Sequence, residues 1–144
     1  QQEQLIARYV GQIELGLHAT RQYIERHGNP GSVEELAGHT LIGFDQATAF
    51  IRSAAKSMPG FDREIFSVRT DNDIAQLALI RAGVGIGICQ AVLANRSDTL
   101  VRVLPNHFSL KLDTWIAMHE DLRNSPRCRR TFDALVAGLQ RHAT

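Results

Sequence analysis

The feature that most constrains the fold is the run of residues 69–90, RTDNDIAQLALIRAGVGIGICQ, in which the spacing of apolar residues changes at Gly83. Before Gly83 the apolar residues recur every three or four positions, and this spacing predicts a helix. We expect its buried stripe to be Ile74, Leu77 and Ala78. After Gly83 large and small residues alternate, which predicts a strand whose apolar positions are Val84, Ile86 and Ile88. The run therefore contains a helix, then glycines, then a strand.

The start of this helix is polar. Thr70 or Asp71 is expected at the N-cap, because a short side-chain oxygen there can accept a hydrogen bond from a free amide of the first turn. Such a helix start points out of the end of a sheet, where open α/β folds bind ligands. An ordinary helix cap explains the same residues, and the residues alone favour that simpler interpretation.

The glycines have the spacing G-x-G-x-G, which invites comparison with nucleotide-binding loops. A dinucleotide fingerprint needs a strand, a glycine turn and a helix in that order, with the phosphates at the helix N-terminus. Here the order is the reverse. We therefore interpret Gly83 as the end of the helix, and Gly85 and Gly87 as strand positions that other backbone approaches closely.

Composition argues against several classes of function. The 144 residues are 44% hydrophobic and 22% charged, which is typical of a globular chain with one or two lobes. A net charge of +1 offers no electrostatic footprint for nucleic acid, and no apolar run reaches membrane-spanning length. The first residues lack the pattern of a signal peptide. Cys89 and Cys128 lack C-x-x-C spacing, so we expect free thiols in a reducing cytoplasm.

Strands and helices alternate along the rest of the chain. Residues 1–12 carry no folding signal, and a half-buried strand is predicted from Ile13 to His18. Thr20 is expected to cap a short helix that stops at Gly28. The other predicted strands span residues 41–44, 64–69, 100–104 and 112–118. The other predicted helices follow a Ser32–Glu35 capping box, Asp45 and Ser125, and residues 91–96 are predicted as a short helix or a turn.

The last predicted helix, from Pro126 to Gln140, has the clearest amphipathic pattern in the chain. Its apolar stripe consists of Cys128, Phe132, Leu135, Val136 and Leu139.

No motif for catalysis or metal binding stands out. The run His119-Glu120-Asp121 is the nearest to a catalytic cluster, but adjacent loop residues do not face one site, so a solvated turn is the better interpretation. The run Asp71-Asn72-Asp73 lacks the ligand spacing of a calcium loop. His18 could line a cleft, although a surface histidine with satisfied hydrogen bonds is the better interpretation. We expect no enzyme, no catalytic residue, no metal site and no cofactor.

Several segments together resemble one protein family. They are VRTDNDIAQLALIRAGVGIGI, LVRVLP and WIAMHEDLRNSPRCRRTFDALVAGL, preceded by HATRQYIERHG and SVEELAGHTLIGF. In this order they resemble the effector-binding domain of LysR-type transcriptional regulators over nearly the whole chain. One difference is Gln90, where many relatives have a proline after the glycine-rich strand.

The resemblance implies an α/β fold similar to type 2 periplasmic binding proteins, in which two lobes joined by crossing strands hold a small molecule in a cleft. Residues 18–111 resemble the second lobe, and residues 1–17 and 112–144 resemble the crossing strands and part of the first lobe. We therefore expect one complete lobe plus part of a second. The family's amino-terminal DNA-binding domain and the opening half of its first lobe are expected to be missing from this chain.

The resemblance also implies a function and a site. Gly43 and Phe44, at the end of a strand, and Thr70 and Asn72, at the start of a helix, match positions that line the effector cleft. The implied function is the sensing of a small-molecule effector, with a carboxylate as one candidate class, in a cytoplasmic bacterial transcriptional regulator. DNA would be bound only through the missing domain, and no membrane is involved.

Two further expectations follow from the same resemblance. A solute-binding domain of a transport system with the same architecture is the alternative function. Because part of the first lobe is expected to be absent, the last helix should expose apolar surface and promote self-association.

Overall fold

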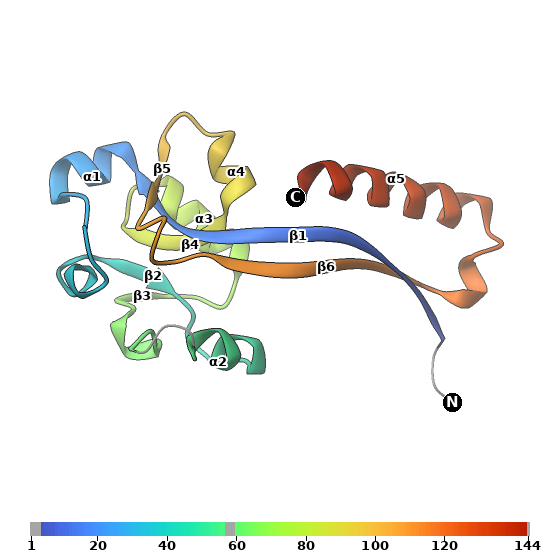
Figure 1. The fold of residues 1–144 in the computed structure, drawn as a ribbon, viewed down its shortest axis with the longest axis horizontal. Helices are drawn as coiled ribbons and strands as arrows, with labels where there is room; N and C mark the ends of the chain where they lie inside the picture. Colours follow the sequence, from blue (N-terminus) through green and yellow to red (C-terminus); the bar gives the residue numbers. More distant parts are fainter. Residues whose placement is uncertain (1–3, 57–59, 144) are drawn as a thin grey trace. The chain divides into compact units, whose positions relative to one another are not determined.

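The computed structural model describes residues 4–56 and 60–143, with the side chain of residue 54 left out. The chain divides into two compact units, which are described separately. The sheet unit is Leu15–Leu110, and the ribbon unit combines Gln1–Glu14 with Lys111–Thr144. The first strand, β1 (Leu5–Thr20), runs through both units (Figure 1).

The sheet unit is built on five strands in the order β3-β2-β4-β1-β5. The strands that follow β1 are β2 (Leu41–Gly43), β3 (Val68–Arg69), β4 (Ile86–Gln90) and β5 (Leu100–Val103). The strand β2 runs parallel to both β3 and β4, whereas β1 runs antiparallel to β4 and β5. The three parallel strands therefore end at the same edge of the sheet.

Apolar side chains cover both faces of this sheet. The larger cluster of buried residues includes Leu17, Tyr23, Leu36, Leu41, Phe61, Phe66, Ile86 and Val103. The smaller cluster on the other face includes Ile42, Ile80, Cys89, Ala94 and Leu100. The helix α1 (Arg21–His27) and a 3-10 helix (Glu34–Gly38) contribute to the larger cluster, and α3 (Asp73–Arg81) and α4 (Ala91–Asn95) to the smaller one. The sheet is thus the middle layer of three.

Two of the predicted helix boundaries are confirmed. Thr20 caps α1, because its hydroxyl oxygen accepts a hydrogen bond from the amide of Tyr23 at 3.1 Å. Gly28 ends the same helix with a φ of 86°, a backbone conformation that residues with a side chain rarely adopt. At α4, Gln90 is the N-cap with a φ of −66°, close to the value that a proline ring imposes. Gln90 therefore has a φ that a proline could also adopt at this position.

The start and the buried face of α3 differ from the prediction. Its N-cap is Asn72, whose side-chain oxygen accepts from the amide of Ala75 at 2.9 Å, and not Thr70 or Asp71. The expected stripe is also wrong, because Ile74 is 81% exposed and Ala78 is exposed. Ile80 is instead fully buried against β2 and β4. The spacing of apolar residues was correct for a helix, but it could not choose between two overlapping stripes.

The glycine-rich strand agrees with the prediction at Gly85 but not at Gly87, where side-chain atoms of Ile80 and Ile42 lie closest and not other backbone. A Cβ on Gly85 would overlap the backbone carbonyl oxygen of Thr40, so other backbone does approach this position closely. Gly83 follows α3 with a φ of 79° and ends the helix as expected. Val84, however, lies before the strand and is partly exposed, so β4 begins only at Ile86.

Two other predicted elements required correction. The strand β1 begins at Leu5, eight residues before the predicted start at Ile13, because its first half pairs with β6 (Leu110–His119). The predicted strand 64–69 is mostly a 3-10 helix (Arg63–Ile65), and only Val68–Arg69 form β3. The helix α2 (Ala49–Ala55) forms as expected. Its expected stop near Met58-Pro59 lies outside the described residues.

The ribbon unit consists of the first half of β1, the strand β6, a 3-10 helix (Glu120–Leu122) and α5 (Pro126–His142). From Leu110 to Met118 the inward side chains of β6 are less exposed than the outward ones in alternation, as expected for a strand covered on one face. The helix α5 supplies that cover. The unit's core contains Val10, Ile116, Met118, Phe132, Val136 and Leu139.

Candidate functional site

The carboxyl-terminal edge of β2 and β3 brings the predicted effector-binding residues together. Gly43 pairs with Arg69 in the parallel register of the two strands, and the next amide, that of Thr70, donates to the carbonyl of Gly43 at 2.9 Å. Phe44 follows Gly43, and Asn72 follows Thr70 by two positions. Residues from two separate segments therefore meet at one sheet edge, which we call the β2–β3 edge (residues 43–46 and 70–72).

Thr70 is half-buried at this edge and has a fixed backbone. Its carbonyl accepts from the side-chain amide of Gln76 at 2.7 Å, and its hydroxyl oxygen accepts from the amide of Asn72 at 3.2 Å. Within the described part of the chain, no acceptor for the hydroxyl proton of Thr70 is present. The hydroxyl is thus oriented by the protein and still able to donate a hydrogen bond to a ligand.

Gly43 and Phe44 can offer a ligand mainly their backbone. A Cβ on Gly43 would overlap the ring of Phe66, so this position must lack a side chain for the aromatic ring to pack. The ring of Phe44 also packs on Phe66, with the centroids 5.0 Å apart and the planes at 67°. Such an edge-to-face contact turns the Phe44 ring towards the core. The side-chain oxygen of Asn72 is engaged as the helix cap.

Sequence reasoning missed that the side chain of Asp71 connects the two segments of this edge. One carboxylate oxygen of Asp71 accepts hydrogen bonds from two successive backbone amides, those of Asp45 at 2.9 Å and Gln46 at 3.0 Å. The carboxylate of Asp45 is held in turn by the guanidinium of Arg63 at 2.7 Å, a contact that raises the pKa of Arg63. Asp71 was expected only as a helix cap, and no local signal relates it to residues 26 and 25 positions earlier.

His18 and Cys89 lie together inside the sheet unit. His18 is 1% exposed, so the interpretation as a surface histidine was wrong. Its Nδ1 lies 2.9 Å from the carbonyl of Gly16 and 3.3 Å from the Sγ of Cys89. Burial raises the pKa of the Cys89 thiol to about 11, although Arg81 and Arg102 act in the opposite direction. The thiol therefore stays protonated at neutral pH and is a poor nucleophile.

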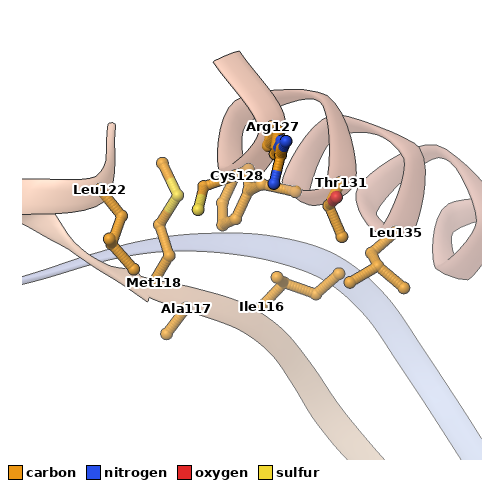
Figure 2. A pocket seen from close by; sticks show the side chains of 9 residues that line it. Ile116, Ala117, Met118, Leu122, Arg127, Cys128, Thr131 and Leu135 are labelled. Atoms are coloured by element: carbon orange, nitrogen blue, oxygen red, sulfur yellow. The ribbon is translucent and has the colours of Figure 1, made fainter. Parts of the chain in front are cut away.

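The ribbon unit contains an open groove of about 290 Å³ between β6 and α5. Figure 2 shows the side chains of Ile116, Met118 and Leu135 along it, with Arg127 at the helix. Apart from Arg127 and Thr131, the lining residues are apolar or cysteine. We call this feature the α5 groove; the predicted apolar stripe of the last helix accounts for much of its wall.

The described residues hold no cluster of side chains suited to metal binding. No group of three or more potential metal-ligating side chains occurs within residues 4–56 and 60–143. His119 instead completes a local turn, with its Nδ1 3.2 Å from the amide and 3.4 Å from the carboxylate of Asp121. In the same ranges, no helix is both long enough and apolar enough to cross a lipid bilayer.

Comparison with solved structures identifies the fold. The regulatory domain of CrgA, a LysR-type transcriptional regulator from Neisseria meningitidis, superposes with a TM-score of 0.74 at 23% identity, over 94% of this chain and 69% of that one. The structure of CrgA itself gives a TM-score of 0.71 at 25% identity, over 94% and 48%. The full-length virulence activator AphB from Vibrio cholerae gives 0.65 at 22% identity, over 97% and 49%. The chain thus spans about half the length of CrgA and AphB.

Comparison at the level of sequence gives the family. The search of curated protein sequences found no match. The family model of the LysR substrate binding domain, in contrast, matches residues 1–140. The predicted α/β fold of the type 2 periplasmic-binding-protein kind is confirmed, because LysR regulatory domains have that fold. The family comprises regulatory domains of transcription factors and not enzymes. This chain belongs to the LysR substrate binding domain family.

Proposed function

We propose that this chain senses a small-molecule effector for a LysR-type transcriptional regulator, and that the effector binds at the β2–β3 edge. The observation that carries the proposal is the oriented hydroxyl of Thr70 beside the end of β2. In open α/β folds, ligands bind outside the carboxyl ends of the parallel strands, and this edge is such a place. The match of the LysR family over nearly the whole chain supports the regulatory role.

The proposed contacts come from both segments of the edge. The hydroxyl of Thr70 donates to the effector, and Asn72 and the backbone of Gly43 and Phe44 complete the contact surface. A carboxylate is the effector class to test first, since the edge has a hydroxyl donor and its amides of Asp45 and Gln46 already bind a carboxylate of the protein. The lobe assignment, with residues 18–111 as the second lobe and residues 1–17 and 112–144 as crossing strands and partial first lobe, belongs to the same proposal.

The proposal also covers how the regulator recognises DNA and where in the cell it works. DNA is recognised by a part of the regulator outside these residues, and the regulator works in the cytoplasm, where free thiols such as those of Cys89 and Cys128 persist. A solute-binding domain of a transport system remains the alternative, but the family match favours the regulator.

Thr70→Ala tests the site. A thermal-shift screen of small carboxylates, aromatic acids and amino acids first identifies compounds that raise the melting temperature. Calorimetry on Thr70→Ala should then show an affinity about fivefold weaker for the best compound, because one hydrogen bond contributes about 1 kcal/mol. The melting temperature of the free protein should change little, since Asn72 and not Thr70 caps α3.

Thr99→Ala is the matched control. Thr99 is an exposed threonine of the sheet unit, but it precedes β5 beside the end of β1, away from the β2–β3 edge. This variant should keep the affinity of the unmodified chain. Equal affinity in Thr70→Ala and Thr99→Ala would reject the proposed position of the effector.

A further inference from the structure

Asp71 already binds the pair of backbone amides that a carboxylate ligand would use at the β2–β3 edge. The amides of Asp45 and Gln46 point at a single oxygen of its carboxylate, at 2.9 and 3.0 Å. Successive backbone amides that converge on one point form a general binding site for anions. The structure therefore contains a carboxylate bound at this site, and the carboxylate belongs to the protein itself.

Neighbouring side chains do not compete for these amides. The Asp45 carboxylate is turned to Arg63, which donates to it from Nε at 3.0 Å and from the terminal nitrogen at 2.7 Å. Gln46 is exposed, and the hydroxyl of Thr70 accepts from Asn72. Among the described residues, only Asp71 accepts from the amides of Asp45 and Gln46 with a side chain.

Asp71 can leave the amides at low steric cost. Its side chain is exposed, so rotation about its own bonds carries the carboxylate into water. In the described part of the chain no cation pairs with it. What holds Asp71 in place is the two hydrogen bonds to the amides, and a ligand carboxylate can replace both of them.

We propose that Asp71 is a specificity-determining residue of the effector site, an internal carboxylate that an anionic effector must displace from the amides of Asp45 and Gln46. This inference rests on the proposed function of the β2–β3 edge and adds to it the class of ligand and a built-in competitor. The apparent affinity of such a ligand is its intrinsic affinity multiplied by the fraction of molecules in which Asp71 has left. If Asp71 occupies the amides about 90 to 99% of the time, the affinity falls about 10- to 100-fold.

The test compares three variants by NMR titration with benzoate and succinate, and with benzamide as a neutral probe. Asp71→Ala frees the amides and should bind the carboxylates at least tenfold more tightly than the unmodified chain. Asp71→Asn keeps an oxygen on the amides without the charge, and its affinity for the carboxylates should rise much less. Asp73→Asn removes a neighbouring charge at the first turn of α3. Because Asp73 makes no contact with these amides, the affinity of this variant for the carboxylates should also rise little.

The readout is the resonances of the Asp45 and Gln46 amides. They should move on addition of carboxylate, but not of benzamide, in both the unmodified chain and Asp71→Ala. An equal rise in carboxylate affinity in all three variants would show that charge alone matters, and would overturn the proposal. Titrations in which these two resonances stay still would overturn it as well, provided that the variant's other amide resonances show a folded chain.

The proposed function fails by a different result. If a compound from the thermal-shift screen perturbs Thr70 while Asp71→Ala leaves carboxylate binding unchanged, the effector site stands and the displacement is wrong. If no compound perturbs any residue of the β2–β3 edge, both proposals fail.

Discussion

At the scale of single residues, Gly85 shows how a side chain can be excluded by the backbone of another segment. The amide of Ile86 donates to the carbonyl of Thr40 at 2.9 Å, and a Cβ on Gly85 would overlap that same carbonyl oxygen. Gly85→Ala should therefore lower the free energy of unfolding by about 1 to 3 kcal/mol, as other overpacked positions do. Urea denaturation followed by circular dichroism measures the change.

Gly38→Ala is the control for this prediction. Gly38 ends the 3-10 helix Glu34–Gly38, and a Cβ there would meet no atom within 4 Å. Its substitution should leave the midpoint of unfolding nearly unchanged. Equal stability of the two variants would mean that β4 can move away from Thr40, and that the close approach is not required for the fold.

At the scale of elements, the helix α5 is held by a few buried side chains on one face. Phe132 is 6% exposed and packs with Val10 and Val136, whereas Leu135, one residue before Val136, is 51% exposed. Phe132→Ala should lower the free energy of unfolding by about 3 to 5 kcal/mol. Leu135→Ala should lower it much less, because the side chain of Leu135 is already half exposed to solvent. Hydrogen exchange of the α5 amides tests both, and equal loss of protection would contradict the assigned buried face.

At the scale of the whole molecule, the exposed apolar groups predict self-association. Leu122 and Leu135 line the α5 groove and are 44% and 51% exposed. Burying a large apolar side chain contributes about 1.5 to 3 kcal/mol, so contact between the grooves of two copies is favourable. Sedimentation should show a dimer at micromolar concentration. The expected role of α5 in this contact stays a prediction.

Leu135→Asp should shift the sedimentation profile towards monomer, because it places a charge in the proposed interface. Ile74→Asp is the matched control, since Ile74 is 81% exposed on α3 in the other unit. It should leave association unchanged. A folded monomer at every concentration of the unmodified chain would show that the α5 groove does not mediate contact between copies.

The sequence by itself determined the features that depend on neighbouring residues. The cap at Thr20, the helix end at Gly28 and the change from helix to strand at Gly83 were all predicted, because each depends on residues a few positions apart. The family and the fold class followed from the order of such segments. That Gly43, Phe44, Thr70 and Asn72 bind an effector stays a prediction, although the structure does bring them to one edge.

Only the tertiary structure decided the features that depend on distant segments. The early start of β1 requires its pairing with β6, about a hundred residues later. The burial of His18 depends on Cys89, and the contacts of Asp71 depend on the end of β2. The N-cap is Asn72 and not Thr70 or Asp71, because the amide of Thr70 pairs with Gly43 and the carboxylate of Asp71 binds the amides of residues 45 and 46. A short-range pattern states which conformations a segment can adopt, whereas hydrogen bonds and packing across the fold select among them.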